Sequence, residues 1–361
     1  MHNREIPSMQ HLIDISYGNI SRDDSEDPFD AYNEHELYKL IWNYYQEYSD
    51  IHTLQYKIKN DKESHTVNTL LGVEENKSIE ITNINVHDSK FTQFDEDTME
   101  SIGFEVLDDV VQDLTDIVYK NYTVNVGRID FKSLMAVSDL FLYELANAYN
   151  SNEITKDKFP IRNKLLQNIS DFKQPVRPRG STSGGVIIAN TNDGWKLILG
   201  QRSEKANINR GKISIFPNGK TQYSDFIQDG FLTTLKREFT EELFDENSKG
   251  DIFFDDYITV EPVSAGWNLR DGDLSVGYLL VINSTVGYDI FKNTLEKNKE
   301  LDEIVEVPID DFEVIKQTID FDNMSGAPIS TVCEGLKFID ESKLYPDLPY
   351  DIDSSADFDI I

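Results

Sequence analysis

Histidine and cysteine are scarce in this 361-residue chain, and their positions exclude several kinds of chemistry. Cys333 is the only cysteine, so the chain can form no internal disulfide and no metal site built from several cysteines. All six histidines lie between His2 and His87, so residues 88–361 contain no imidazole. Serine–histidine and cysteine–histidine catalysis are excluded there unless the first segment reaches across. Chemistry in that part must use carboxylates, lysine, tyrosine or a bound metal.

Basic residues are also few: 34 Lys and Arg stand against 66 Asp and Glu, which gives a net charge of −32. Nucleic acids and anionic membranes attract basic surfaces, so this charge argues against both as general partners. No stretch approaches the roughly 20 apolar residues of a membrane span, and the first residues lack the pattern of a secretory signal. Apolar residues make up 39% of the chain, enough for a packed core. We therefore expect a folded, cytoplasmic protein.

Shifts in composition divide the chain into two domains, a linker and two polar ends. The linker sequence KQPVRPRGSTS is rich in proline, glycine and hydroxyl residues, which suit neither a helix nor a strand interior. We predict, in chain order, a polar acidic arm (1–33), a mixed α+β domain of unknown role (34–172), the linker (173–183), a second domain (184–340) and an acidic flexible tail (341–361).

Apolar periodicity gives a coarse prediction of the elements in both domains. In the first domain it predicts helices at about 34–57, at 107–118, up to about Asn150 and at 161–171, and strands at 79–87 and 123–131. In the second domain it predicts strands at 184–190, 195–201, 276–283 and 303–309, with a helix at 231–246. The first domain carries no recognisable catalytic signature.

The predicted helix FLTTLKREFTEELFDE (231–246) carries most of the chemical information. Glu238, Glu241 and Glu242 are spaced i, i+3 and i+4, so they project from one face, while apolar residues follow the other face. Three clustered carboxylates repel one another and need a counter-charge, which a hard divalent cation supplies. The alternative interpretation is a solvated glutamate face on a surface helix.

The segment that precedes this helix reverses the local sign of charge. It holds five basic residues and one acidic residue between Arg202 and Lys220. A basic loop beside a carboxylate-bound metal suits a polyphosphate, with the metal on the bridging oxygens and Arg or Lys on the outer ones. Arg202, Lys212 and Lys220 are therefore candidate substrate-binding residues. The alternative is that they only neutralise the acidic remainder of the chain.

Residues 237–242, R-E-F-T-E-E, match the core of the box G-x5-E-x7-R-E-U-x-E-E-x-G-U, and the chain here resembles the Nudix hydrolase superfamily. Counting back eight positions from the arginine places Asp229 at the box glutamate. Gly219 is the best match for the leading glycine if the loop is about four residues longer, and Phe244 stands where the box has its second glycine. The order of strands, loop and helix over about 180–340 is also the family's order.

The resemblance implies a fold, a cofactor and a reaction. The fold would be α/β, a Nudix-like α/β/α sandwich with a mixed sheet, preceded by the separate α+β domain. Glu238, Glu241 and Glu242 would bind Mg²⁺, with Mn²⁺ as the other option, and Arg237 would hold a carboxylate or the preceding loop. A metal-activated water would then hydrolyse a pyrophosphate bond in a nucleoside diphosphate linked to another moiety.

Family members commonly add one more carboxylate, as a base or further ligand, from a loop before the last strand. Glu296, Glu300 and Glu303 are candidates, and Glu303 joins Arg237 and the three glutamates in the predicted catalytic set. Gly219 belongs to the predicted substrate-binding loop. Trp267, in a predicted loop, is a candidate for stacking on a nucleobase, with a packing role as the alternative.

Two functions remain open at this stage. The intact R-E-F-T-E-E core favours a pyrophosphatase acting on a nucleotide-type small molecule, with nucleic acid a substrate only as a capped end. The missing box glycine and the longer loop favour a catalytically weak or inactive nucleotide-sensing module coupled to the N-terminal domain. No membrane partner is expected in either case, and a homodimer is left open.

Overall fold

The computed structural model describes less than the full chain, and the C-terminal domain is its main part. The described residues are 83–86, 114–120, 123–129, 148, 180–203, 211–228, 230–244, 247–267, 273–295, 301–310 and, near the end, 314–315, 318, 324, 331–332, 334–336 and 338–339. The predicted arm, the helices at 34–57 and 161–171, the tail, Asp229, Glu296, Glu300 and Cys333 lie outside these residues.

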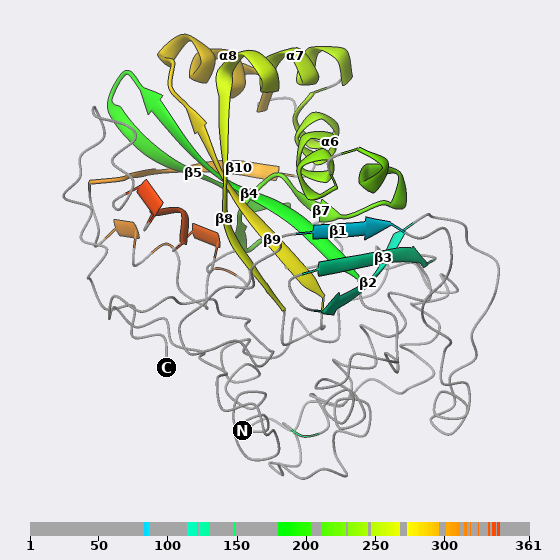
Figure 1. Ribbon diagram of the computed structural model, residues 1–361. Coiled ribbons are helices and arrows are strands. Elements are labelled where there is room, and N and C mark those ends of the chain that lie inside the picture. The colour runs from blue at the N-terminus through cyan, green and yellow to red at the C-terminus, as the bar shows by residue number, and fades with distance from the viewer. Residues whose placement is uncertain are drawn as a thin grey trace.

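A seven-stranded mixed sheet forms the centre of the C-terminal domain (Figure 1). The path β10–β5–β4–β9–β8 is antiparallel except for β4 and β9, which run parallel, and β6 and β7 add to β5 and β4. The strands are β4 (Ser181–Thr191), β5 (Gly194–Arg202), β6 (Ile213–Ser214), β7 (Asn218–Lys220), β8 (Ile258–Trp267), β9 (Leu274–Ile282) and β10 (Leu301–Pro308).

Two boundaries differ from the sequence prediction. Strand β4 begins at Ser181, inside the range predicted as linker, because residues 181–189 pair with β9 along their whole length. Trp267, predicted in a loop, is the last residue of β8 and pairs with Leu274 of β9. In both places the pairing with a buried central strand extends the element beyond what local composition predicts.

Helices lie against both faces of this sheet. They are α6 (Phe231–Leu243), α7 (Asn247–Tyr257) and α8 (Thr285–Leu295), with a short 3₁₀ helix, η2 (Tyr223–Ile227), before α6. A Cβ at Gly185 of β4 would contact Leu235 of α6, whereas one at Gly335, in the helical residues near the C-terminus, would contact Val186. Gly185 and Val186 are neighbours on one strand and point to opposite faces. No described helix has the length and apolar character needed to cross a membrane.

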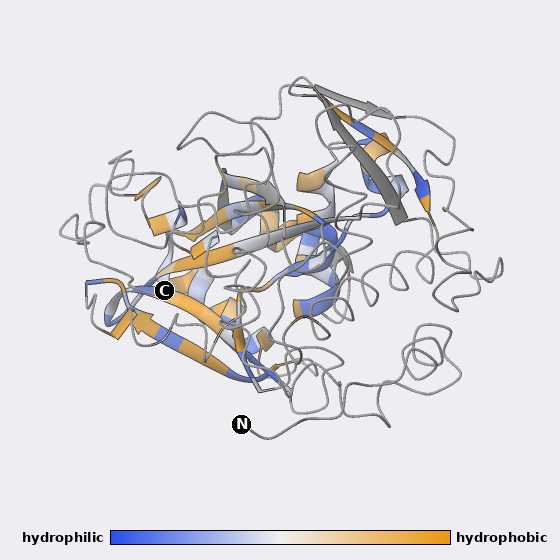
Figure 2. Cartoon of the chain, turned by 90° about the horizontal axis from the view of Figure 1, so that it is seen from below, coloured by the Kyte–Doolittle hydropathy of each residue, from blue (hydrophilic) through white to orange (hydrophobic). Residues whose placement is uncertain are grey.

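Phe239 lies at the centre of an aromatic cluster that fixes α6 on the sheet. Its side chain is fully buried, and the rings of Phe253 and Phe254 on α7 and of Phe291 on α8 lie 5.2–6.3 Å away. Hydrophobic residues, orange in Figure 2, also run along the strands of the large sheet. The apolar face of α6 is therefore buried in the core, and its glutamates lie on another side of the helix.

A small sheet precedes this domain, with strand order β1–β3–β2. Its strands are β1 (Asn83–Val86), β2 (Leu114–Lys120) and β3 (Thr123–Ile129), so strands fall where 79–87 and 123–131 were predicted to be extended. The helix predicted over 107–118 is wrong for its last residues, because β2 pairs with all seven residues of β3. The β-branched residues Ile117 and Val118 suit that pairing better than a helix.

We predict that Phe239→Ala lowers the free energy of unfolding of the C-terminal domain by about 3–5 kcal/mol, because it leaves a cavity inside the aromatic cluster. Ile227→Ala is the control: that side chain is 72% exposed, and its loss should cost no more than about 0.5 kcal/mol. Urea denaturation followed by circular dichroism measures both. Equal effects of the two substitutions would contradict this placement of α6.

Candidate active site

Helix α6 presents the glutamates in the predicted arrangement. The helix spans Phe231–Leu243, so Glu238, Glu241 and Glu242 share one side of it, next to the side that carries Phe239. Their burial differs: the side chain of Glu238 is 16% exposed and that of Glu241 is 49% exposed. One carboxylate is therefore set into the protein while another reaches solvent.

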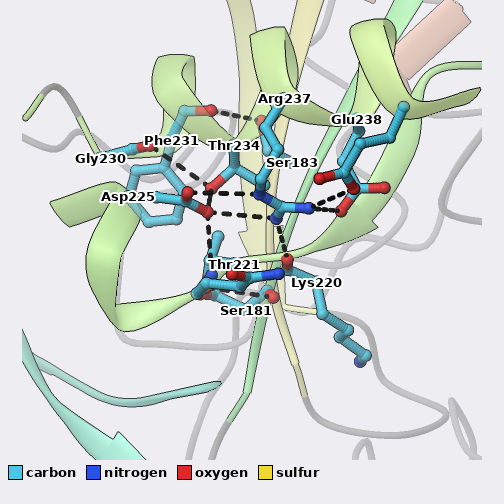
Figure 3. Close-up of polar contacts among 12 residues, drawn as sticks. Ser181, Ser183, Lys220, Thr221, Asp225, Gly230, Phe231, Thr234, Arg237 and Glu238 are labelled. Carbon is cyan, nitrogen blue, oxygen red and sulfur yellow. Dashed lines mark hydrogen bonds and ion pairs between the residues drawn. The ribbon is translucent and has the colours of Figure 1, made fainter. Parts of the chain in front are cut away.

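Arg237 ties this face of α6 to the preceding loop (Figure 3). Its Nη2 donates to the backbone carbonyl of Lys220 at 2.9 Å. Its Nε and Nη2 donate to the two carboxylate oxygens of Asp225 at 3.3 and 3.2 Å. This is the two-pronged pairing that the planar guanidinium makes with a carboxylate. Arg237 thus performs the predicted role of holding the loop.

Asp225 is the acidic partner of this pair, and its carboxylate is completely engaged. The residue is 3% exposed and lies within η2. Besides Arg237, its carboxylate accepts a hydrogen bond from the Gln222 backbone N–H at 2.9 Å and from the Thr234 hydroxyl at 2.7 Å. Backbone bonds from Gln228 and Gly230 to its carbonyl close the turn that leads into α6.

The alignment of the box is corrected by this geometry. Counting back from the arginine predicts Asp229 as the box acid, but the acid that pairs with Arg237 is Asp225. Counting forward from Gly219 finds it, since five residues separate Gly219 from Asp225, as in G-x5-E. The extra residues of this chain therefore lie between the acid and the arginine. Gly230 lies among them with a φ of 56°, a conformation that favours glycine and lets the chain turn sharply into α6.

The other side of the Arg237 guanidinium holds two of the glutamates. Its Nη1 donates to Glu238 at 2.6 Å and to Glu241 at 3.1 Å. Burial lowers the pKa of Arg237, but the hydrogen bonds and charges of Asp225 and Glu238 outweigh that effect and raise it. Burial raises the pKa of Glu238, and the neighbouring Arg237 only partly opposes this rise. Arg237 therefore offsets only part of the cost of burying the Glu238 charge.

Gly219 lies directly under the Glu238 carboxylate. A Cβ at this position would stand 2.0 Å from the Glu238 Cδ, so any other residue here would displace the Glu238 carboxyl group. The adjacent Asn218 backbone N–H donates to Glu242 at 3.3 Å. Strand β7 thus contacts two of the three glutamates. Gly219, predicted to bind substrate, instead lies against Glu238.

The predicted basic residues separate into two groups. The Lys220 ammonium pairs with Asp273, which is 2% exposed, and Figure 3 shows the Lys220 side chain pointing away from Glu238. Arg202 and Lys212 are neighbours through their backbones, because the Arg202 N–H donates to the Lys212 carbonyl at 2.9 Å. Both of the latter side chains are half-buried at the end of β5.

Glu303 is the one remaining candidate whose side chain lies among the described residues. Glu303 is exposed on β10, an edge strand, opposite Gln201 of β5, whereas α6 packs on β4 and β7. The Trp267 side chain lies outside the described residues. Direct contacts therefore join Arg237 to Glu238, Glu241 and Asp225, while the Asn218 N–H binds Glu242.

Phe244 explains how the chain manages without the second box glycine. It caps α6 with φ −131° and ψ 135°, an extended conformation open to any residue. Its ring packs against Phe239 at 5.8 Å and Phe253 at 5.5 Å. The position needs no positive φ, and the larger side chain joins the aromatic cluster between α6 and α7.

The three glutamates suit a divalent cation in donor type. Mg²⁺ and Mn²⁺ prefer carboxylate oxygens as ligands. Within the part of the chain that the structure describes, however, no three carboxylate or imidazole groups form a closed cluster able to hold a metal. Arg237 is the cation between Glu238 and Glu241 in this arrangement.

No family model and no curated protein matches this chain. Solved structures of the Nudix/MutT family do match, over roughly its C-terminal half. Shewanella oneidensis NrtR is 14% identical (TM-score 0.33); the match covers 46% of this chain and 66% of NrtR, just under two thirds. A mutT/nudix family protein from Listeria innocua is 16% identical (TM-score 0.33), with coverage of 46% and 98%. The NUDIX domain of NrtR with ADP ribose is 12% identical (TM-score 0.26), with coverage of 43% and 87%.

We predict that Asp225→Ala lowers the free energy of unfolding by about 3 kcal/mol, because it leaves the Arg237 guanidinium without its buried partner. Asp255→Ala is a matched control, since Asp255 pairs with Lys236 of the same helix but is 65% exposed. Loss of that surface pair should cost less than about 1 kcal/mol. Chemical denaturation compares the two variants, and equal losses would contradict the organising role of Asp225.

Proposed function

We propose that the C-terminal domain is a divalent-metal-dependent hydrolase that cleaves a pyrophosphate bond in a nucleoside diphosphate linked to another moiety. The observation that carries the proposal is the unit of Arg237 with Glu238 and Glu241, fixed to the preceding loop by Asp225. The proposal is also supported by spacing, since Asp225 stands six positions after Gly219, as the acid of G-x5-E does.

The residues would divide the work as follows. Glu238, Glu241 and Glu242 would hold Mg²⁺ or Mn²⁺, which when bound neutralises phosphate charge and acidifies water. Arg237, anchored by Asp225 and by the Lys220 carbonyl, orients Glu238 and Glu241. Gly219 keeps space for the Glu238 carboxylate. Arg202 and Lys212, which are adjacent at the end of β5, would neutralise the outer phosphate oxygens.

A second candidate function is a nucleotide-sensing module that binds without turnover. It is favoured by the hold of Arg237 on two of the glutamates and by the lack of a closed carboxylate cluster in the described residues. The two candidates differ in one measurable respect: the hydrolase would convert the substrate into a nucleoside monophosphate and a phosphorylated second moiety, whereas the sensor would bind the nucleotide and leave it intact. A screen of ADP-ribose, NAD(H), dinucleoside polyphosphates, capped RNA and nucleoside triphosphates, read for binding and for products, separates them.

We expect Glu242→Gln to reduce the hydrolysis rate by about two orders of magnitude or more, because it removes a negative charge that the metal requires. The fold should persist, because the glutamine oxygen can still accept the Asn218 N–H. Glu261→Gln is the control and should keep the wild-type rate. Glu261 lies on β8, the edge strand beyond β9, whereas α6 packs on β4 and β7. The rate is measured on the best substrate from the screen, with Mg²⁺ present.

Metal binding provides the independent check. Isothermal calorimetry of the wild type with Mg²⁺ and Mn²⁺ at millimolar concentration should show binding that Glu242→Gln weakens. If the wild type binds neither cation, the hydrolase assignment is wrong and the sensing module takes its place.

A further inference from the structure

The small N-terminal sheet touches the loop that supports the box. Residues of β3 lie against η2, and β2 lies beside β4. Figure 1 shows the small sheet next to the ends of β4 and β9. The contact centres on one pair: the Arg128 guanidinium carbon of β3 stands 3.8 Å from the centroid of the Tyr223 ring. This is a close cation–π stack, a geometry in which the guanidinium plane and the ring attract each other.

Tyr223 occupies a sensitive position in that loop. It is the first residue of η2 and is 7% exposed. It directly follows Gln222, whose N–H binds the Asp225 carboxylate, and it stands two positions before Asp225 itself. A ring clamped at this point restricts the backbone that aims Asp225 at Arg237.

We propose that Arg128 is a positioning residue for the box, supplied by the N-terminal part of the chain. The path runs from Arg128 to Tyr223, through η2 to Asp225, and from Asp225 to Arg237 and its two glutamates. Every step is a direct contact or a covalent neighbour. The inference deepens the proposed function and rests on it for its catalytic consequence, while its structural core concerns the order of η2 alone.

The first domain then acts on the site by holding a loop. Loss of the stack should loosen η2, allow Asp225 to leave Arg237 part of the time, and scatter Glu238 and Glu241. Turnover should fall more than substrate affinity. The glutamates would act at the reacting phosphate through the metal, and they would make no contact with the rest of the substrate.

Hydrogen exchange on the full-length chain tests the structural core. Arg128→Ala should speed the exchange of the amides of Gln222, Gln228 and Gly230 by on the order of tenfold. Tyr223→Leu should do the same, Tyr223→Phe should keep the wild-type protection, and the double variant Arg128→Ala/Tyr223→Leu should add little to either single one. Lys292→Ala is the matched control, since it removes a cation 5.8 Å from the Tyr288 ring on α8, away from η2.

The catalytic consequence is measured on the same proteins. Arg128→Ala should weaken Mn²⁺ binding and lower kcat by on the order of tenfold with KM nearly unchanged, and Tyr223→Phe should not. Unchanged exchange of 222–230 in a folded Arg128→Ala protein overturns the proposal. If Arg128→Ala does not fold, Tyr223→Leu decides by the same exchange measurement. A wild type without metal binding or turnover would defeat the proposed function, yet the exchange result would still decide the role of Arg128.

Discussion

The ion pair between Asp225 and Arg237 is the interaction on which the site depends. Asp225 is buried, and the energy of leaving either charge unpaired in that position greatly exceeds what a surface pair contributes. The pair therefore fixes a loop and a helix relative to each other. Because one guanidinium also binds the Lys220 carbonyl, Glu238 and Glu241, it sets the positions of β7 and of two glutamates at once.

The two faces of α6 are held by opposite kinds of force. On one face, burial of Phe239 among aromatic rings fixes the helix without directional demand. On the glutamate side, the carboxylates need hydrogen-bond donors: Arg237 donates to Glu238 and Glu241, and the Asn218 N–H of β7 donates to Glu242. Gly219 leaves room for the Glu238 carboxyl group. The non-directional core thus sets where the helix lies, and the directional contacts set which way its carboxylates point.

The helix and its glutamate face could be predicted because both follow from local periodicity and from a contiguous motif. Asp225 could not be separated from Asp229 by counting, since an insertion can sit on either side of the acid and only the pairing with Arg237 shows which. The strand β2 was missed for a related reason: Leu114 and Ile117 fit a helical pattern, and the partner β3 overrides it. The pairing of Lys220 with Asp273 could not be predicted either, because the two residues are far apart in the sequence and no local pattern connects them.

The free-energy cost of the insertion between Asp225 and Arg237 can be compared with the stabilisation from the Arg128–Tyr223 contact. The family pattern separates its acid and arginine by seven residues, whereas eleven lie between Asp225 and Arg237 here. Closing the longer loop costs about 0.4 kcal/mol more chain entropy, by the logarithmic dependence on length. A cation–π stack at a buried ring contributes about 0.5–2 kcal/mol, which is enough to offset that cost. A longer, looser tether can therefore hold Arg237 as firmly as a short one, provided that the N-terminal sheet stays in contact with it.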